Sequence, residues 1–423
     1  MNTIRQLSEA DFDDLIPVLA NAYPAFIQLV SEQDRIKFKE RLKAQDADPI
    51  VDFYGLYRKR KLLGTMRFFD FTMQLLSTKA RVAGLGGVAV DLAHKKEKVA
   101  RDMVAYFLRH HREKGICLAA LYPFRPDFYK KMGFGYGAKM NRYQVKPASL
   151  PKNGRKERAR FLRPDDKAAL LACYNRCLAK THGLIEKSAY DAQRIFEDAE
   201  NRLIGYVEGE QLSGYLILAF QHVRDNPDRN DILVKELVYE NQAAVLGLLT
   251  FLHTQADQFE HVIFELQDDN FHYLLNDPRN DSGNRIAHLS QECNTQGLGI
   301  MYRLIDTAGA FKLLAAHNFG GQSCRLKLTV RDDFLPENEG STLVHFENGL
   351  PCLAAGEHAD NDADNHEVEI CLDIADFSSL LMGAVDFKSL CRYGLASISN
   401  ASYTDTVNRI FLTEQKPVCM TLF

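Results

Sequence analysis

Apolar and polar residues alternate along the chain in segments that predict strands separated by amphipathic helices. Ser8 is suited to cap an N-terminal helix. Apolar positions at helical spacing follow at Phe12, Leu15, Ile16 and Leu19. Further along, strands are predicted at 53–57, 62–71, 82–90, 116–121 and 135–145, and a helix at 99–114. This order of elements indicates an α+β fold built as an α/β sandwich rather than a helix bundle.

A second cycle of the same kind begins near residue 161. Residues 161–166 echo residues 4–9 in leading from a strand into a helix. Strands are then predicted at 202–207, 212–221 and 232–239, and a helix at 243–255. Between the two cycles, residues 146–160 are basic and contain two prolines and a glycine, which is typical of a linker. We interpret the pattern as an internal duplication.

The pattern changes again after residue 300. Strands are predicted at 301–305, 324–330, 343–347 and 367–372, and helices at 307–316, 374–382 and 386–390. A chain of 423 residues accommodates two or three domains at roughly 150 residues each. The domain boundaries that we predict are 1–146, 158–297 and 298–423.

Composition excludes several classes of protein. Lys and Arg number 52 against 56 Asp and Glu, so the net charge of −4 offers no footprint for nucleic acid or an anionic membrane. The nine cysteines are scattered without a C-x-x-C pair, which indicates reduced thiols. No apolar run approaches the ~20 residues of a membrane span. We expect a soluble, cytoplasmic protein.

The segment between Gly84 and Arg101 carries the chemical information. Gly84, Gly86 and Gly87 lie within a predicted strand, not at the strand-to-helix turn where a phosphate-binding loop belongs. Glycines in a strand are more typical of a bulge or a close backbone approach. The glycines alone therefore do not predict a nucleotide site.

The basic turn after this strand is more informative. Lys95, Lys96 and Lys98 precede a helix whose free N–H groups and dipole favour an anion. A pyrophosphate would be held there, while the strand edge at residues 88–90 would pair with an extended pantetheine arm. A solvated basic turn on the surface is the alternative interpretation.

Two motifs then resemble a known superfamily. Val88-Ala89-Val90 followed by H-x-x-x-x-x-A-R resembles the acetyl-CoA motif of GNAT-superfamily N-acetyltransferases, and residues 128–137, FYKKMGFGYG, resemble the closing segment of the same fold. With G-x-G-G-V-A-V in the same chain, the sequence is similar to the Eis-type (enhanced intracellular survival) acetyltransferases. Those have an active GNAT domain, a degenerate GNAT-like domain and a sterol-carrier-like α+β domain. The likeness spans the chain in length and domain order, with its sharp motifs confined to residues 84–137.

The resemblance implies acetyl-CoA as co-substrate, with no metal. It also implies a general acid at Tyr129, since a phenol near the sulfur can protonate the departing thiolate. Tyr136 is the competing choice, although it falls in the following strand. The cofactor-binding residues that the resemblance implies are Val88, Ala89, Val90, Lys95, Lys96, Glu97, Lys98, Val99, Ala100, Arg101, Phe124 and Arg125.

The general base implied by the resemblance is a terminal carboxylate, here that of Phe423. The last six residues carry no charged side chain, and such an apolar tail is expected to be held down rather than frayed. An α-carboxyl group of pKa about 3.5 is a weak base, so it would need desolvation or an intervening water.

Lys98 departs from the superfamily, which has glycine where the backbone must approach the pyrophosphate closely. A lysine amide can donate there if its φ stays negative, and its ammonium group would add charge. Its side chain would also be able to obstruct the site. Acetyl-CoA binding therefore depends on the conformation of this residue.

These observations give a leading hypothesis and two alternatives. The first is acetyl transfer from acetyl-CoA to a primary amine of an aminoglycoside, polyamine or peptide-like acceptor, in a homo-oligomer that the resemblance implies is a hexamer. The second is a non-catalytic acyl-CoA-binding protein. The third is a lipid carrier, in which residues 377–382 line a tunnel rather than form core.

Two further segments are interpreted as structural. Residues 241–245 take the place of the phosphate turn in the second cycle, but they have neither glycine nor a basic cluster. Residues 360–365 begin like a calcium loop, yet the sixth position is not glycine and the twelfth is not glutamate, so a hairpin loop is predicted.

Overall fold

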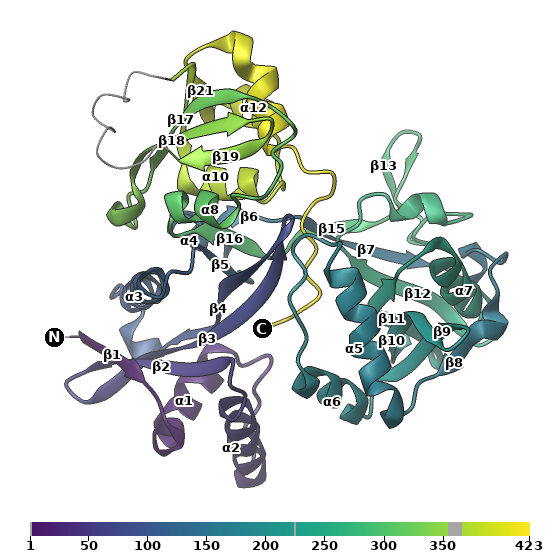
Figure 1. Cartoon of the computed structure of the whole chain (residues 1–423). Coiled ribbons are helices and arrows are strands. Elements are labelled where there is room, and N and C mark those ends of the chain that lie inside the picture. Colours follow the sequence, from purple (N-terminus) through teal and green to yellow (C-terminus); the bar gives the residue numbers. More distant parts are fainter. Residues whose placement is uncertain (1, 224–225, 354–365) are drawn as a thin grey trace. The chain divides into compact units, whose positions relative to one another are not determined.

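The computed structural model describes residues 2–223, 226–353 and 366–423 (Figure 1). The chain forms two compact units. Unit 1 comprises Met1–Gly137, Gly299–Pro417 and Thr421–Phe423, and unit 2 comprises Ala138–Leu298 and Val418–Met420. The segment 360–365, predicted as a hairpin loop, lies outside the described residues.

Unit 1 begins with a mixed sheet. In order across the sheet its strands are β1 (Asn2–Gln6), β2 (Val51–Arg58), β3 (Lys61–Leu75), β4 (Thr78–Val90), β5 (Leu118–Leu121), β16 (Met301–Leu304) and β6 (Gly135–Tyr136). Its helices are α1 (Phe12–Ala22), α2 (Glu32–Asp46), α3 (Val99–Glu113) and α4 (Pro126–Lys130). Neighbouring strands are antiparallel except for the parallel pair β4 and β5.

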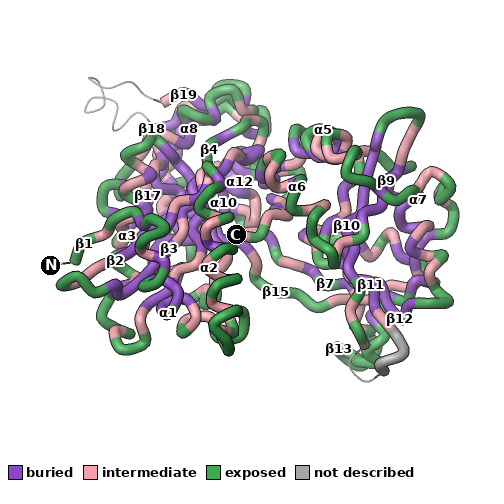
Figure 2. Tube along the Cα trace, turned by 90° about the horizontal axis from the view of Figure 1, so that it is seen from below, coloured by how far each residue is buried: buried purple, intermediate pink, exposed green. Residues whose placement is uncertain are grey.

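Helices α1 and α3 cover opposite faces of this sheet. Phe12 of α1 packs edge-on against Phe53, with ring centroids 5.6 Å apart. Phe107 of α3 packs against Phe68 at 5.0 Å, and Phe68 stacks on Tyr54 at 4.1 Å. Because successive strand residues point to opposite faces, Phe53 and Tyr54 place the two helices on different sides. The predicted α/β sandwich is confirmed, and its buried interior is visible in Figure 2.

Unit 2 repeats this plan. In order across the sheet its strands are β15 (Thr295–Leu298), β7 (Lys139–Val145), β12 (Phe259–Leu266), β11 (Asn226–Tyr239), β10 (Gln211–Val223), β9 (Arg202–Glu208) and β8 (Ala159–Phe161), with a separate hairpin of β13 (Arg285–Ala287) and β14 (Ser290–Gln291). Its helices are α5 (Lys167–Leu178), α6 (Ala189–Glu197) and α7 (Gln242–His253). Helices α7 and α5 each pack in a separate apolar cluster against alternate strand residues, as α3 and α1 do in unit 1.

The duplication extends to individual hydrogen bonds. Arg5 donates to the carboxylate of Asp11, six residues on, and the backbone N–H of Ser8 donates to the same carboxylate at 2.9 Å. In unit 2, Arg160 donates to Asp166 at 2.8 and 2.7 Å, again six residues on. Both pairs connect a strand to the turn that starts the next helix. This shared arrangement corresponds to the similarity between residues 4–9 and 161–166 in the sequence.

The last part of unit 1 is a smaller sheet with its own helices. Its strands, in order, are β19 (Leu350–Leu353), β18 (Gly340–Glu347), β17 (Cys324–Arg331), β20 (Val368–Asp373) and β21 (Ala396–Ile398). Its helices are α8 (Thr307–Leu313), α10 (Ile374–Leu381), α11 (Phe387–Arg392) and α12 (Thr404–Phe411). Every residue of α10 is buried, and the helix packs on β16 and β6 of the larger sheet. The segment 377–382 is therefore core and not the wall of a tunnel.

Two segments differ from expectation because of close packing. Residues 135–145, predicted as one strand, form β6 and β7 in different sheets. The break comes at Gly137, whose N–H donates to the Ile300 carbonyl at 3.0 Å and where a side chain would meet that oxygen at 2.6 Å. Residues 146–160, expected to be a linker, pack on α7: Leu150 is buried, and a Cβ on Gly154 would lie 2.2 Å from the Leu246 carbonyl oxygen.

Strand β16 is a further difference. The pattern assigned residues 301–305 to the start of the third domain, but β16 is hydrogen-bonded between β5 and β6 in the first sheet. An isolated apolar strand carries no information on which sheet it completes, so its partner could not be read from periodicity.

Candidate active site

The end of β4 has one open edge. Pairing with β5 stops at Leu85, opposite Leu121, whereas pairing with β3 continues to Val90, opposite Gly64. Residues 86–90 of β4 therefore have no strand partner on their second side among the described residues. Val88, Ala89 and Val90 lie on this edge, where an extended chain could add as a further strand.

The glycines at the start of this edge and just before it produce a bulge and close packing, as predicted. The register between β3 and β4 shifts after Thr65, and Gly87 takes a φ of +57° there. A Cβ on Gly84 would lie 2.4 Å from the ring of Phe71. None of the glycines begins a helix, so they do not form a phosphate loop.

The start of α3 is an uncapped helix N-terminus. Lys98 occupies the N-cap position without a side-chain hydrogen bond, and Asp102 is the first residue whose N–H bonds back, to the Lys98 carbonyl at 2.9 Å. The N–H groups of Val99, Ala100 and Arg101 have no acceptor within the described residues. Exposed Lys95 and Lys96 precede them. This arrangement attracts an anion.

Lys98 has a positive φ, contrary to the condition expected from the sequence. Its φ is +64° and ψ is 10°, which is the left-handed region that glycine occupies readily. The chain thus follows the path of the superfamily glycine and accepts backbone strain of about 1–2 kcal/mol. The amide keeps a glycine-like orientation while an ammonium group is added at the exposed surface.

Several of the predicted cofactor residues already have partners. Glu97 pairs with Arg58 of β2, and Arg125 pairs with Asp127 at 2.6 Å. The guanidinium of Arg101 lies over the Phe334 ring at 5.7 Å. Phe124 is 67% exposed, between β5 and α4. The charge left for a phosphate group is therefore mainly that of the lysines in the turn.

Tyr129 lies in α4 and is buried. Its ring packs edge-on against Phe124, Phe128 and Phe134, with centroids 5.2–6.1 Å away. It belongs to the apolar cluster that also contains Leu121 and is covered by Val88. Burial, and to a lesser extent Tyr23, raises the pKa of Tyr129 well above its ordinary value, so the phenol keeps its proton throughout the neutral range.

Tyr23, just after α1, is a site residue that the sequence did not reveal. Its hydroxyl donates to the carbonyl of Val88 at 2.8 Å, so it reaches the open edge of β4. Burial raises the pKa of Tyr23, and the nearby Arg67 guanidinium opposes that rise. A tyrosine after a helix carries no spacing signal, and only the fold places it beside Val88.

Phe423 is held against the sheet of unit 1. Its ring makes edge contacts with Phe69, Phe71 and Tyr122, with centroids 4.9–5.4 Å away. A Cβ on Gly86 would lie 3.1 Å from the Phe423 carboxyl carbon and 3.3 Å from its oxygen. The terminal carboxyl group thus lies two residues from Val88 along β4, and Figure 1 shows the end of the chain beside β3 and β4.

The corresponding site in unit 2 is closed by its own side chains. Asn241 caps α7 by accepting from the Ala244 N–H at 2.9 Å, which supplies the acceptor that the start of α3 lacks. On β11, Glu236 is buried between the Tyr215 hydroxyl and the Lys187 ammonium, the latter at 2.6 Å. The structural role inferred for residues 241–245 agrees with this capping.

A buried ion pair supports the turn after Tyr129. Arg303 of β16 donates to both oxygens of Asp332 at 2.8 Å, and both side chains are fully buried. A Cβ on Gly133 would lie 1.3 Å from a guanidinium nitrogen of Arg303, so only glycine fits over it. The arginine in the middle of an apolar strand was the available sequence signal, and it was missed.

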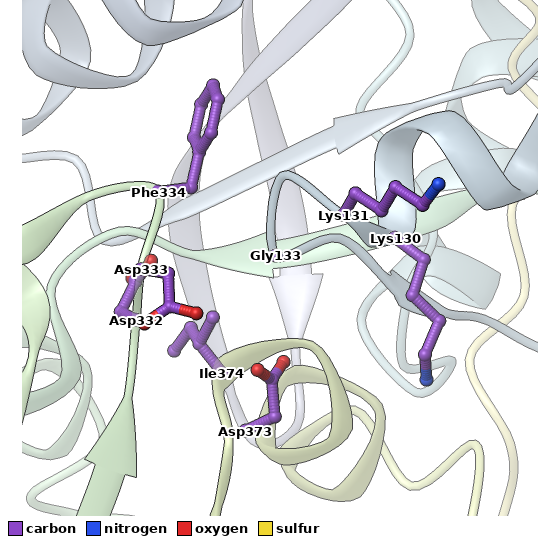
Figure 3. A pocket seen from close by; sticks show the side chains of 8 residues that line it. All are labelled: Lys130, Lys131, Gly133, Asp332, Asp333, Phe334, Asp373 and Ile374. Atoms are coloured by element: carbon purple, nitrogen blue, oxygen red, sulfur yellow. The ribbon is translucent and has the colours of Figure 1, made fainter.

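A cavity of about 240 Å³ lies next to this pair and contains none of the predicted site residues. It is lined by Lys130, Lys131, Gly133, Asp332, Asp333, Phe334, Asp373 and Ile374 (Figure 3). Lys130 pairs with Asp376 at 2.7 Å.

Throughout the described residues, no group of His, Cys, Asp and Glu has the arrangement of a metal site. None of the described helices is long and apolar enough to cross a membrane.

The sheet with the open edge of β4 and the uncapped start of α3 lies in a part of the chain that matches the GNAT acetyltransferases, and this is the class of the protein. Residues 3–137 and residues 178–303 each match a family described as acetyltransferase (GNAT) domain, and residues 311–420 match the sterol carrier protein domain. The chain thus contains two GNAT acetyltransferase domains and a C-terminal sterol carrier protein domain. GNAT domains use acetyl-CoA as co-substrate.

Solved structures share this fold over the full chain. A GCN5-related N-acetyltransferase from Anabaena variabilis ATCC 29413 is 18% identical with a TM-score of 0.81, over 100% of both chains. One from Kribbella flavida is 20% identical with a TM-score of 0.78, over 100% of this chain and 98% of its own. Eis1 from Mycobacterium abscessus is 16% identical with a TM-score of 0.76, over 100% of both chains. No curated protein sequence matches the chain.

Proposed function

We propose that the protein transfers the acetyl group of acetyl-CoA to a primary amine in unit 1. The observation that carries the proposal is the open edge of β4 at residues 86–90 beside the uncapped start of α3. An open strand edge binds an extended amide chain by backbone hydrogen bonds, and an uncapped helix start binds phosphate. The duplicate in unit 2 lacks the uncapped helix start, because Asn241 caps α7.

The residues present fit acetyl-CoA. The N–H groups of Val99–Arg101 and the ammonium groups of the lysine turn would hold its pyrophosphate, and the β4 edge and Phe124 would lie along its pantetheine. The co-substrate supplies the acetyl group as an activated thioester. Amide N–H groups around Val88 would polarise the reacting carbonyl.

Tyr129 is proposed as the general acid. The acceptor nitrogen attacks the thioester carbon, a C–N bond forms, and the C–S bond breaks. The sulfur takes the proton of the Tyr129 hydroxyl, which is then replaced from solvent. The raised pKa of Tyr129 keeps the phenol protonated before the reaction, and it donates only as negative charge develops on the sulfur. Tyr23 acts as a positioning residue, because its hydrogen bond fixes the Val88 carbonyl.

The terminal carboxylate of Phe423 is proposed as the general base. It takes the proton that the nitrogen loses as the amide forms, directly or through a water. Contacts of its ring with Phe69, Phe71 and Tyr122 support this role, since they hold the carboxylate next to Gly86. No acyl-enzyme is required, because the attack is direct.

The acceptor classes considered are aminoglycosides, polyamines and peptide-like amines. A homohexamer in the cytoplasm stays a prediction, which sedimentation and fractionation would test. A non-catalytic acyl-CoA-binding protein is the second candidate function, favoured by the lysine at position 98. A lipid-carrier function has less support, because α10 is packed as core.

Thermal-shift titration with acetyl-CoA, followed by assay of free thiol with a panel of amines, tests the proposal. Stabilisation by acetyl-CoA with amine-dependent thiol release is expected. Stabilisation without thiol release for any amine would favour the non-catalytic alternative. Absence of stabilisation at millimolar acetyl-CoA would overturn both, and stabilisation by fatty acids alone would favour the carrier.

A further inference from the structure

Arg67 is a partly buried cation next to the proposed reaction site. It lies on β3 directly opposite Gly86, at the bulge of β4. Its Nε would lie 2.8 Å from a Cβ on Gly87, and its guanidinium lies over the Phe69 ring at 5.6 Å. Phe69 also contacts the Phe423 ring. Arg67 therefore adjoins the same short stretch of β4 as the Phe423 carboxylate.

This guanidinium has no anionic partner. Its single hydrogen bond within the described part of the chain is to the neutral Gln45 side chain, at 3.1 Å. No ion pair links it to any carboxylate there, that of Phe423 included. Arg303, by comparison, is fully buried and donates to both carboxylate oxygens of Asp332. Arg67 is half-buried rather than fully buried, unlike Arg303.

The surroundings of Arg67 disfavour a second cation. Burial, together with exposed Arg41 of α2, lowers the pKa of Arg67, and Tyr23 opposes the change. A polycationic acceptor would bring ammonium groups against two arginines. An oxyanion would instead restore charge-assisted hydrogen bonds to a partly desolvated guanidinium.

We infer that the acceptor is an amine that carries an oxyanion, a carboxylate or a phosphate, close to its reacting nitrogen, and that Arg67 binds this group with Arg41 assisting. This rests on the proposed function, in which the amine lies between Val88 and the Phe423 carboxylate. It excludes aminoglycosides and polyamines as preferred acceptors and favours amino acids, the amino ends of short peptides and phosphorylated amines.

Matched acceptor pairs test the inference on the full-length protein. The pairs are glycine with glycinamide, and phosphoethanolamine with ethanolamine, with spermidine and an aminoglycoside as polycationic acceptors. We expect kcat/KM to be about tenfold or more higher for at least one oxyanion-bearing member than for its neutral partner. The better of the two pairs identifies the oxyanion as carboxylate or phosphate.

Variants locate the effect. Arg67→Gln should bring the oxyanion-to-neutral ratio close to one, Arg67→Lys should restore part of it, and Arg41→Gln should lower it partially. Arg109→Gln, which removes an exposed arginine on α3, is the matched control and should leave the ratio unchanged. A thermal shift with acetyl-CoA in each variant shows that it is folded, and Arg41→Gln provides the test if Arg67→Gln does not fold.

Three outcomes overturn the inference. One is equal or better acetylation of the neutral or polycationic acceptors. Another is an oxyanion preference that survives in Arg67→Gln. The third is an equal loss with every acceptor, which would make Arg67 a partner of the Phe423 carboxylate instead. Failure of every acceptor to stimulate thiol release would instead count against the proposed function itself, which distinguishes that failure from the three outcomes above.

Discussion

The carboxyl carbon of Phe423 lies against Gly86, 3.1 Å from where a Cβ on that glycine would be. Gly86 does not have a positive φ, so alanine is compatible with its backbone. The added methyl group would displace the Phe423 carboxylate by a few tenths of an ångström. A group that takes a proton from the reacting amine is sensitive to such a shift.

Gly86→Ala is therefore expected to lower kcat at least tenfold while changing the acetyl-CoA affinity little. Steady-state thiol release and the thermal-shift titration measure the two quantities. Gly297→Ala is the matched control, because no atom lies within 4 Å of a Cβ there. One glycine added after Phe423 replaces the carboxylate with an amide, and full activity of that variant would exclude the terminal base.

Tyr129→Phe removes the proposed acid and keeps the ring packing. General acid catalysis contributes about 10²–10⁴-fold, so kcat should fall by about that factor while the acetyl-CoA shift persists. Tyr23→Phe removes one hydrogen bond to Val88 and should cost less, about tenfold. Tyr136→Phe, in the adjacent β6, should have no effect. If Tyr136→Phe lowers kcat by the same factor as Tyr129→Phe, the assignment of Tyr129 as the general acid is wrong.

Lys98→Gly separates the strain of residue 98 from its charge. Relief of a left-handed lysine, about 1–2 kcal/mol, exceeds the entropic cost of glycine, about 0.5–1 kcal/mol. The Tm should stay unchanged or rise slightly. Loss of one exposed ammonium should weaken acetyl-CoA binding about two- to fivefold, since exposed ion pairs contribute about 0.2–1 kcal/mol.

Lys59→Gly is the control for this experiment. Lys59 also has a positive φ, 49°, but it lies in the turn between β2 and β3. Its replacement should affect the Tm as Lys98→Gly does and leave the acetyl-CoA affinity unchanged. Tighter binding by Lys98→Gly would show that the lysine side chain obstructs the site.

The buried pair of Arg303 and Asp332 gives a prediction on stability. Asp332→Asn leaves a fully buried guanidinium without its anion, which costs about 3–5 kcal/mol. The double variant Arg303→Met/Asp332→Leu should be more stable than Asp332→Asn, because neither charge remains. Chemical denaturation measures both. Asp277→Asn, at an exposed pair with Arg279, should be close to neutral, and a similar loss there would contradict the argument.

Much of the fold could be predicted from local patterns, because the periodicity of apolar residues reports which face of a helix or strand is buried. The helix at 99–114 matches α3 within one residue, and the echo of residues 4–9 in 161–166 returns as two equivalent Arg–Asp pairs. Three features depended on partners distant in sequence: the place of β16 in the first sheet, the split of 135–145 and the packing of 146–160. Periodicity reports which face of an element is buried, not what buries it.

The candidate site also contains residues that the sequence predicts and residues that only the fold reveals. The lysine turn and Tyr129 lie in contiguous motifs, and the structure gathers them in unit 1 with Phe423. Tyr23 follows α1 and Arg67 lies on β3, and only the fold brings them to the open edge of β4. The φ of Lys98 was also beyond the sequence, since a lysine gives no indication of a left-handed backbone.

His111 on α3 links stability to pH. Its ring is fully buried against Phe68 and Phe107, and its Nδ1 donates to the Phe107 carbonyl at 2.8 Å. Burial is the largest cause that lowers the pKa of His111, from 6.5 to about 4, although Asp70 lies 3.7 Å from Nε2 and acts in the opposite direction. The neutral ring is therefore the form that fits the folded state.

The sign follows from proton binding. Between pH 6.5 and 4 the unfolded chain protonates His111 and the folded chain does not, so folding stability falls as the pH is lowered through this window. A shift of this size corresponds to about 3 kcal/mol, all of it present above pH 6.5. His111→Gln should be less stable than wild type at pH 7, with a difference that shrinks toward pH 4. Tm measured against pH for both proteins tests this, with exposed His288→Gln as control, and a constant difference across the window would show that His111 is protonated in the folded state.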